Sequence, residues 1–319
     1  MMTTARLNSF LEKKPYLIVT TGLILGFVFP DFFVFLKPLV PWVFALYTLT
    51  QALKTGLRDL GRVFTSPLPL LLILLCVHGV SPLFAFFLGK FAFGPDSPFF
   101  TGLVLTSAIP IAVSSTLWVG LAGGHLPLAL TAVAIDSLLC PLTVPFLISL
   151  FLKKSVDFNA SSLILSLLQM VLIPTLIGVL IHELILTKGR NKTARAHWRG
   201  LYAKFSLSFI IAVNIASARK EILSLNLLGL FLVILTVLLF NMTLGYWVAR
   251  LMGYSPALTR TFIFVTGLRN NGVGIVIALS YFPPEVALPL IATILLQQPL
   301  SSIILPLLNR KSQSSTAQQ

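Results

Sequence analysis

Charged residues are scarce in this chain, and acidic ones are the scarcest. Only 10% of its 319 residues are charged, with 9 Asp or Glu against 23 Lys or Arg. Soluble domains carry about 25% charged residues. So little polar surface cannot cover a water-soluble globule of this length, whereas 56% hydrophobic residues suit contact with lipid. The composition therefore predicts an integral membrane protein and excludes a soluble domain.

Several chemical motifs are also missing. The only two cysteines, Cys76 and Cys140, lie in apolar runs, which excludes a disulfide scaffold and indicates small core residues. The sequence has no phosphate-binding glycine loop of the kind that an ATP-driven pump needs. The stretch "IHELIL" lacks the second histidine of a zinc-binding helix, and no nucleophile elbow of a hydrolase occurs. No cofactor, metal or enzymatic activity is expected. Nucleic acid is not expected as a partner either, because the net charge of +14 is divided among short clusters between apolar segments.

What the sequence does have is long apolar segments. A membrane helix needs about 20 apolar residues, fewer where it is irregular. Ten segments qualify, near residues 16–30, 36–53, 66–90, 98–122, 126–152, 160–185, 201–218, 225–250, 257–281 and 285–308. The first is followed by no small-residue cleavage site, so it is interpreted as a retained helix and not a signal peptide. The predicted fold is an all-α membrane protein of ten transmembrane helices.

The basic residues predict the orientation of these helices. With an inside N-terminus, 6 of the 23 basic residues fall outside, Arg269 falls within the membrane, and the other sixteen fall inside. The six outside are Lys37, Lys90, Lys153, Lys154, Arg219 and Lys220. Since cytoplasmic loops carry the excess of Lys and Arg, both termini are predicted to be cytoplasmic, in a multi-pass protein of the cell membrane.

An internal repeat is the next feature. The fourth segment carries "SAIPIAVSSTLWVG" and the ninth "FVTGLRNNGVG", and similar segments follow, "LPLALTAVAIDSLLCPLTVP" and "LPLIATILLQQPLSSIILP". Two halves of five spans each are inverted relative to one another, and matched interruptions in such halves point to a transporter's binding site. The alternative is two Gly/Ser/Pro kinks at helix contacts. The predicted divisions are an N-terminus (1–15), a first repeat (16–152), an external loop (153–159), a second repeat (160–308) and a tail (309–319).

The polar residues at the two interruptions are the candidate substrate- and ion-binding residues. They are Ser114, Ser115 and Thr116 in the fourth segment, and Thr266, Gly267, Arg269, Asn270 and Asn271 in the ninth. A guanidinium beside a helix start favours an organic anion, bidentate for a carboxylate. A permanent structural pair of Arg269 with Asp136 is the alternative.

Two further residues are candidates for proton coupling. Asp136 in "AVAIDSLLCP" and His78 in "CVHGVSP" both lie inside predicted spans. Structural roles, as a hydrogen-bonded carboxylate and a neutral histidine bonded to a neighbouring helix, are the alternatives.

Taken together, these segments resemble the bile acid:sodium symporter family over nearly the whole chain. "GLRNNGVG" is similar to the family's Glu-x-Gly-x-Gln-Asn-x-Gly pattern, and "PIAVSSTLWVGLAGGHLPLALT" is similar to its proline, Ser-Asn and Leu-Ala-x-Gly run. Gly267, Asn270, Gly272 and Ser115 match the family positions. The resemblance implies two inverted five-helix repeats, with helices 4 and 9 broken where they cross at mid-membrane and two sodium ions near the crossing.

The sodium ligands implied by the resemblance are largely replaced. Val265 stands at the glutamate position, Arg269 at the glutamine, Thr116 at the asparagine and Val133 at the threonine. A glutamine of the third span falls near residue 77 or 78. We therefore expect Arg269 to stand in for a sodium ion, in a carrier of a small organic anion of the bile-acid, pantothenate or keto-acid type. Sodium is a doubtful partner and a proton a possible one.

Other readings remain open. One is a sodium symporter whose ions bind backbone carbonyls, and another is a related inverted-repeat efflux permease, such as those for arsenite. A sensor or scaffold without transport, or a membrane enzyme, has no positive feature in the sequence.

Overall fold

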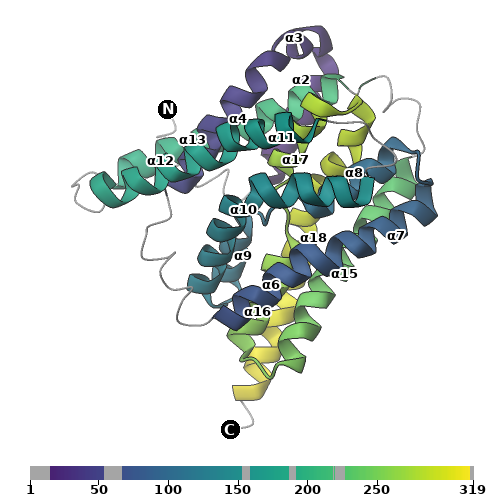
Figure 1. Ribbon diagram of the computed structural model, residues 1–319. Coiled ribbons are helices and arrows are strands. Elements are labelled where there is room, and N and C mark those ends of the chain that lie inside the picture. Colours follow the sequence, from purple (N-terminus) through teal and green to yellow (C-terminus); the bar gives the residue numbers. More distant parts are fainter. Residues whose placement is uncertain are drawn as a thin grey trace.

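Figure 1 shows the computed structural model, which describes residues 15–53, 67–152, 159–186, 192–217, 219 and 227–316. Within these ranges the regular structure is entirely helical, as predicted, and no β-strand occurs. The helices of the first half are α2 (Pro15–Val28), α3 (Pro30–Phe35), α4 (Val40–Ala52), α6 (Pro67–Leu75), α7 (Ser81–Phe93), α8 (Pro98–Ala108), α9 (Ser114–Leu121) and α10 (Leu126–Leu152). Those of the second half are α11 (Ala160–Leu167), α12 (Ile173–Ile181), α13 (Lys192–Ser217), α15 (Leu227–Leu251), α16 (Pro256–Gly267), α17 (Asn271–Tyr281) and α18 (Leu288–Thr316).

Short turns of other helix types join or cap several of these helices. They are the 3₁₀ turns η1 (Lys37–Leu39) and η6 (Pro284–Ala287) and the π turns η3 (Cys76–Val80), η4 (Leu168–Leu172) and η5 (His182–Leu186). Pro82 follows η3 and Pro174 follows η4. Because proline cannot donate to the carbonyl four residues before it, it accounts for the locally irregular ladder.

Five of the described helical segments are long and apolar enough to cross a membrane, judged by length and composition. They are Pro67–Phe93, Leu126–Leu152, Ser161–Leu184, Leu228–Leu251 and Pro284–Leu308. Large apolar side chains point outward from them, such as Phe91 on α7 and Leu142 on α10. Such a surface suits lipid and not water, which supports the predicted multi-pass membrane protein.

The bounds of the helices lie close to the predicted segments. Helix α10 coincides with the predicted 126–152, whereas α13 begins nine residues before the predicted 201–218. Of the predicted terminal and loop segments, residues 1–14, 153–158 and 317–319 lie outside the described residues, as do the basic residues of 54–66 and 187–191.

The helices form two packed groups. Helix α13 packs against α2, α3 and α4, and α12 packs against α4; in Figure 1 they extend from the top (α2 and α3) to the upper left (α4, α12 and α13). Helix α15 packs against α7, α16 and α18; α7 lies at the right of Figure 1, and α16 and the end of α18 lie at the bottom. Two apolar clusters fill the interior, one including α8 and α17 and the other including α9 and α16. Each cluster thus holds one half of each interrupted segment, and the two interruptions lie between the clusters.

Candidate functional site

The first break separates α8 from α9. Helix α8 ends at Ala108, and residues 109–113 are not helical before α9 begins at Ser114. Pro110 explains the break, because it has no N–H and forces the residue before it out of the helical region. Ile109 is accordingly extended, with φ −69° and ψ 157°.

The second break separates α16 from α17. Helix α16 ends at Gly267, Leu268 is extended with φ −112° and ψ 128°, and α17 begins at Asn271. Glycine in a helix costs about 1 kcal/mol relative to alanine. The stretch "GLRNNGVG" holds three glycines, so interrupting the helix costs least there.

The two breaks pair with each other as a short antiparallel ladder. Ala112 N donates to Leu268 O at 3.0 Å, and Asn270 N donates to Pro110 O at 2.8 Å. Ile111 and Arg269 face each other as the bridged pair. Main-chain groups freed by the breaks are thereby satisfied inside the protein, as membrane depth requires. In extended pairing, successive side chains point to opposite sides, so Arg269 and Asn270 diverge.

Arg269 points into the protein, toward the π turn η3. Its side chain is 1% exposed. Nη2 donates to the carbonyl oxygen of Val77 at 3.0 Å, while Nε and Nη1 have no hydrogen-bond partner. The residue thus fixes a buried positive charge beside the third predicted span.

Asp136 on α10 is bound at both of its oxygens. Oδ1 lies 2.5 Å from Nε2 of His78, and Oδ2 accepts the main-chain N–H of Ile111 at 2.6 Å. The carboxylate is wholly buried. Asp136 therefore joins the π turn to the first break.

Arg269 and Asp136 do not form an ion pair. His78–Asp136 is the pair found within 4.0 Å among the described residues. The two charges are nevertheless close enough to interact electrostatically. The two residues are connected indirectly instead of by a direct ion pair. One connection runs through Val77 and His78, and the other runs through Ile111.

Two residues absent from the sequence prediction, Gln297 and Gln298 of α18, also contact the breaks. Gln297 Oε1 accepts from Nδ2 of Asn271 at 3.2 Å. Gln298 Oε1 accepts from Trp118 Nε1 at 2.9 Å, and its Nε2 donates to Ser114 Oγ at 3.4 Å. Two adjacent glutamines in the apolar run "LPLIATILLQQPLSSIILP" are the signal that could have identified them.

The remaining predicted site residues differ in what they contact. The Thr266 hydroxyl bonds to the carbonyls of Asn241 and Phe262 at 2.9 and 2.7 Å, and Gly267 packs on Met242. These two residues join α16 to α15. Ser115 is fully buried, and its Oγ has no partner.

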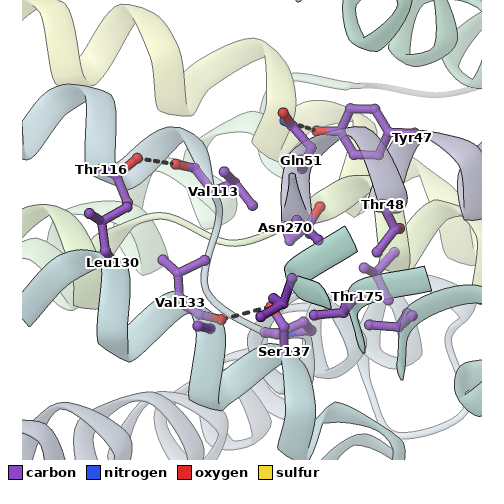
Figure 2. Close-up of a pocket in the computed structure, with 16 residues that line it drawn as sticks. Tyr47, Thr48, Gln51, Val113, Thr116, Leu130, Val133, Ser137, Thr175 and Asn270 are labelled. Atoms are coloured by element: carbon purple, nitrogen blue, oxygen red, sulfur yellow. Dashed lines mark hydrogen bonds between the residues drawn. The ribbon is translucent and has the colours of Figure 1, made fainter. Parts of the chain in front are cut away.

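Asn270 and Thr116 instead line a cavity, shown in Figure 2. About 780 Å³ of space free of protein atoms lies in it, a volume that includes open solvent at its mouth. Its polar lining consists of Tyr47, Thr48 and Gln51 of α4, Thr116 of α9, Ser137 of α10, Thr175 of α12 and Asn270. Every lining residue is uncharged, and neither Arg269 nor Asp136 is among them.

A helical membrane protein with two broken segments paired beside a polar cavity has the features of a secondary transporter. The family model for the Sodium Bile acid symporter family matches residues 43–225, more than half of the chain. The protein therefore belongs to that family, which consists of transporters and not enzymes.

Relatives of the chain include proteins that are named as transporters. The "Uncharacterized protein YbaS" of Bacillus subtilis (strain 168) is 28% identical over 296 residues, covering 92% of this chain and 96% of that protein. The "Uncharacterized sodium-dependent transporter YocS" of the same organism is 26% identical, covering 83% and 81%. The "Probable sodium/metabolite cotransporter BASS1, chloroplastic" of Arabidopsis thaliana is 25% identical, covering 85% and 67%.

Proposed function

We propose that the protein carries a small carboxylate across the cell membrane without the two sodium ions that the resemblance implies. The observation that carries this proposal is Arg269, a buried cation at the paired breaks, next in sequence to the cavity-lining Asn270. Substrates of the pantothenate, keto-acid or bile-acid type fit this chemistry.

The contacts of Arg269 support its role as a substitute for sodium. It stands at a glutamine position of the family pattern and binds the carbonyl of Val77, where that pattern has a second glutamine nearby. Val265, at the glutamate position, is fully buried and supplies no side-chain oxygen. Sodium needs several oxygens, and a guanidinium repels it. The permanent positive charge of Arg269 replaces that of a bound sodium ion.

The cavity supplies the contacts for the carboxylate. Asn270 and Thr116 come from the two breaks, and α17 begins directly after Asn270. The N-terminus of a helix favours a nearby anion, and the charge of Arg269 adds to this preference. Neutral hydroxyl and amide groups then orient the rest of the substrate.

Two inverted five-helix repeats, residues 16–152 and 160–308, are part of the same proposal. Both α8 and α16 start with a Ser-Pro pair whose serine caps the helix, Ser97 and Ser255. In each half, the short helix after the break (α9 or α17) is followed by a long helix with two internal prolines, α10 or α18. The antiparallel pairing of the breaks also agrees with opposite orientations. Ten spans belong to the same proposal; an even number places both termini on one side, and the excess of basic residues makes that side the cytoplasm.

A sodium-coupled carrier is the second candidate. Two of the relatives are named as a sodium-dependent transporter and a sodium/metabolite cotransporter. Here, Ser115 Oγ and Asn271 Oδ1 are buried oxygens without partners at the breaks. They are the side-chain atoms that a sodium ion would use together with main-chain carbonyls.

Uptake into proteoliposomes tests the proposal. Radiolabelled pantothenate, pyruvate and cholate are offered in sodium and in choline buffers to the wild type, Arg269→Gln and the control Arg260→Gln. Arg260 lies on α16, ahead of the second break, and donates to the carbonyl of Gly123 at the protein surface. We expect equal uptake of one carboxylate in both buffers, lost in Arg269→Gln and kept in the control. Uptake that requires sodium, or that survives in Arg269→Gln, contradicts the proposal.

A further inference from the structure

We propose that His78 and Asp136 form a proton-binding site whose proton moves with the substrate. This inference rests on the proposed function. A permanent cation such as Arg269 cannot be bound on one side of the membrane and released on the other. A coupled carrier therefore needs a second cation that can be bound and released. Histidine is the side chain that ordinarily gains or loses a proton between about pH 5 and 8.

The hydrogen bonds around the pair leave one position for this proton. When Asp136 is ionised, it accepts at both oxygens, so Nε2 of His78 is the donor to Oδ1. Nδ1 then carries a free lone pair; this atom is itself buried and has no hydrogen-bond partner in the protein. The His78 side chain is 15% exposed, whereas Asp136 is 0% exposed. Nδ1 is thus where an entering proton binds, and no other bond breaks.

Binding of a proton to His78 changes the net charge of the buried cluster. With neutral His78, the charges of Arg269 and Asp136 cancel, and a proton on Nδ1 leaves the cluster with one net positive charge. This is the charge that a bound monovalent cation would bring. It favours the entry of an anion into the nearby cavity and is removed when the proton leaves.

Few other titratable groups lie near His78. Cys76 belongs to the same π turn as His78 and lies near Arg269, and Cys140 lies one turn after Asp136 on α10. Helix α8, which also packs on η3, has no titratable side chain. The titratable side chains of α15 are Tyr246 and Arg250, on its last two turns. That of α16 is Arg260, which donates to the carbonyl of Gly123.

A chain of contacts connects the proton site to the paired breaks. Asp136 holds the N–H of Ile111, and Ile111 is bridged to Arg269. Arg269 returns to the π turn through the carbonyl of Val77, the residue before His78. A change of charge at His78 therefore acts on both breaks at once. The paired breaks are the element that a carrier must rearrange during transport.

The first test needs no substrate. In a chain with His78 as the sole histidine (His125→Gln, His182→Gln and His197→Gln), NMR of the labelled imidazole nitrogens follows its protonation between about pH 5 and 8. We expect Nε2 to carry a proton throughout and Nδ1 to be the nitrogen that gains one as the pH falls. An imidazole that keeps one state throughout overturns the inference.

The second test uses transport. A pH gradient, acid outside, is imposed on proteoliposomes with a trapped pH-sensitive dye and labelled pantothenate, pyruvate or cholate. We expect the gradient to drive accumulation in the wild type and in His182→Gln, whose ring binds Leu53 O away from the breaks. His78→Gln should lose gradient-driven accumulation, and a melting temperature in detergent near that of the wild type shows that the variant is folded.

The two proposals fail in different ways. Carboxylate uptake without any response to the pH gradient overturns the proton site and leaves the carboxylate carrier standing. If none of the three carboxylates is transported, the proposed function is contradicted, and the NMR titration still decides whether His78 binds a proton.

Discussion

Arg269 and Asp136 are held apart on neighbouring residues of one π turn. Arg269 donates to the carbonyl of Val77, and Asp136 lies 2.5 Å from the ring of His78. Two opposite charges are thus buried in the same region without touching. Arg269 and Asp136 each have their own hydrogen-bond partner. The contacts of one residue can therefore change while the hydrogen bond of the other is kept.

Restoring the family's sodium ligands should restore a response to sodium. In Val265→Glu/Arg269→Gln, a carboxylate and an amide replace the apolar side chain and the guanidinium. We expect sodium to raise the melting temperature of this double variant and not that of the wild type, because a cation bound only by the folded state stabilises it. Equal melting in sodium and choline for a folded double variant would mean that these two positions do not determine ion choice.

Asp136→Asn should be among the most destabilising single changes. It leaves the buried charge of Arg269 without a nearby negative charge, and an uncompensated buried charge costs about 3 to 5 kcal/mol. The same change at exposed Asp31, in the first turn of α3, should cost about 1 kcal/mol or less. Thermal melting in detergent compares the two variants; similar losses would show that the Asp136 charge is not needed for stability.

Asn270→Asp tests the cavity with little change of shape. A negative charge beside the substrate repels a carboxylate, and we expect its affinity to fall by about tenfold or more, equivalent to about 1.4 kcal/mol. Asn159→Asp is the matched control, because Asn159 caps α11 and aspartate caps equally well. Titration calorimetry with the transported carboxylate measures both. Unchanged affinity in Asn270→Asp would remove the cavity from the account.

Gly245→Ala should disturb the packing of α15 against α16. A Cβ there would lie 2.3 Å from Thr266 Oγ1 and 2.6 Å from Phe262 O, both in the segment before the second break. Overpacking of this kind costs about 1 to 3 kcal/mol. Gly229→Ala on the same helix meets nothing within 4 Å and should be neutral or slightly stabilising. Comparable melting temperatures for the two variants would argue against a close contact.

Much of the fold follows from sequence because its causes are local. Apolar run length predicts the helices, and Pro110 and the glycines around Arg269 predict where two of them break. The contacts of Arg269 depend on helix rotation and on the π turn, which no pattern in the apolar run around His78 specifies. The pairing of the breaks and the role of Gln297 and Gln298 are likewise long-range, and so they required the structure.

The dependence of thermal stability on carboxylate and sodium tests the central claim most directly. The purified protein is melted with pantothenate, pyruvate or cholate, in sodium and in choline buffers, since a ligand that binds only the folded state must raise its stability. With Arg269 as the built-in cation, one carboxylate should stabilise the protein equally in both buffers. Stabilisation by a carboxylate only when sodium is present would contradict this account and show that sodium still binds at the paired breaks.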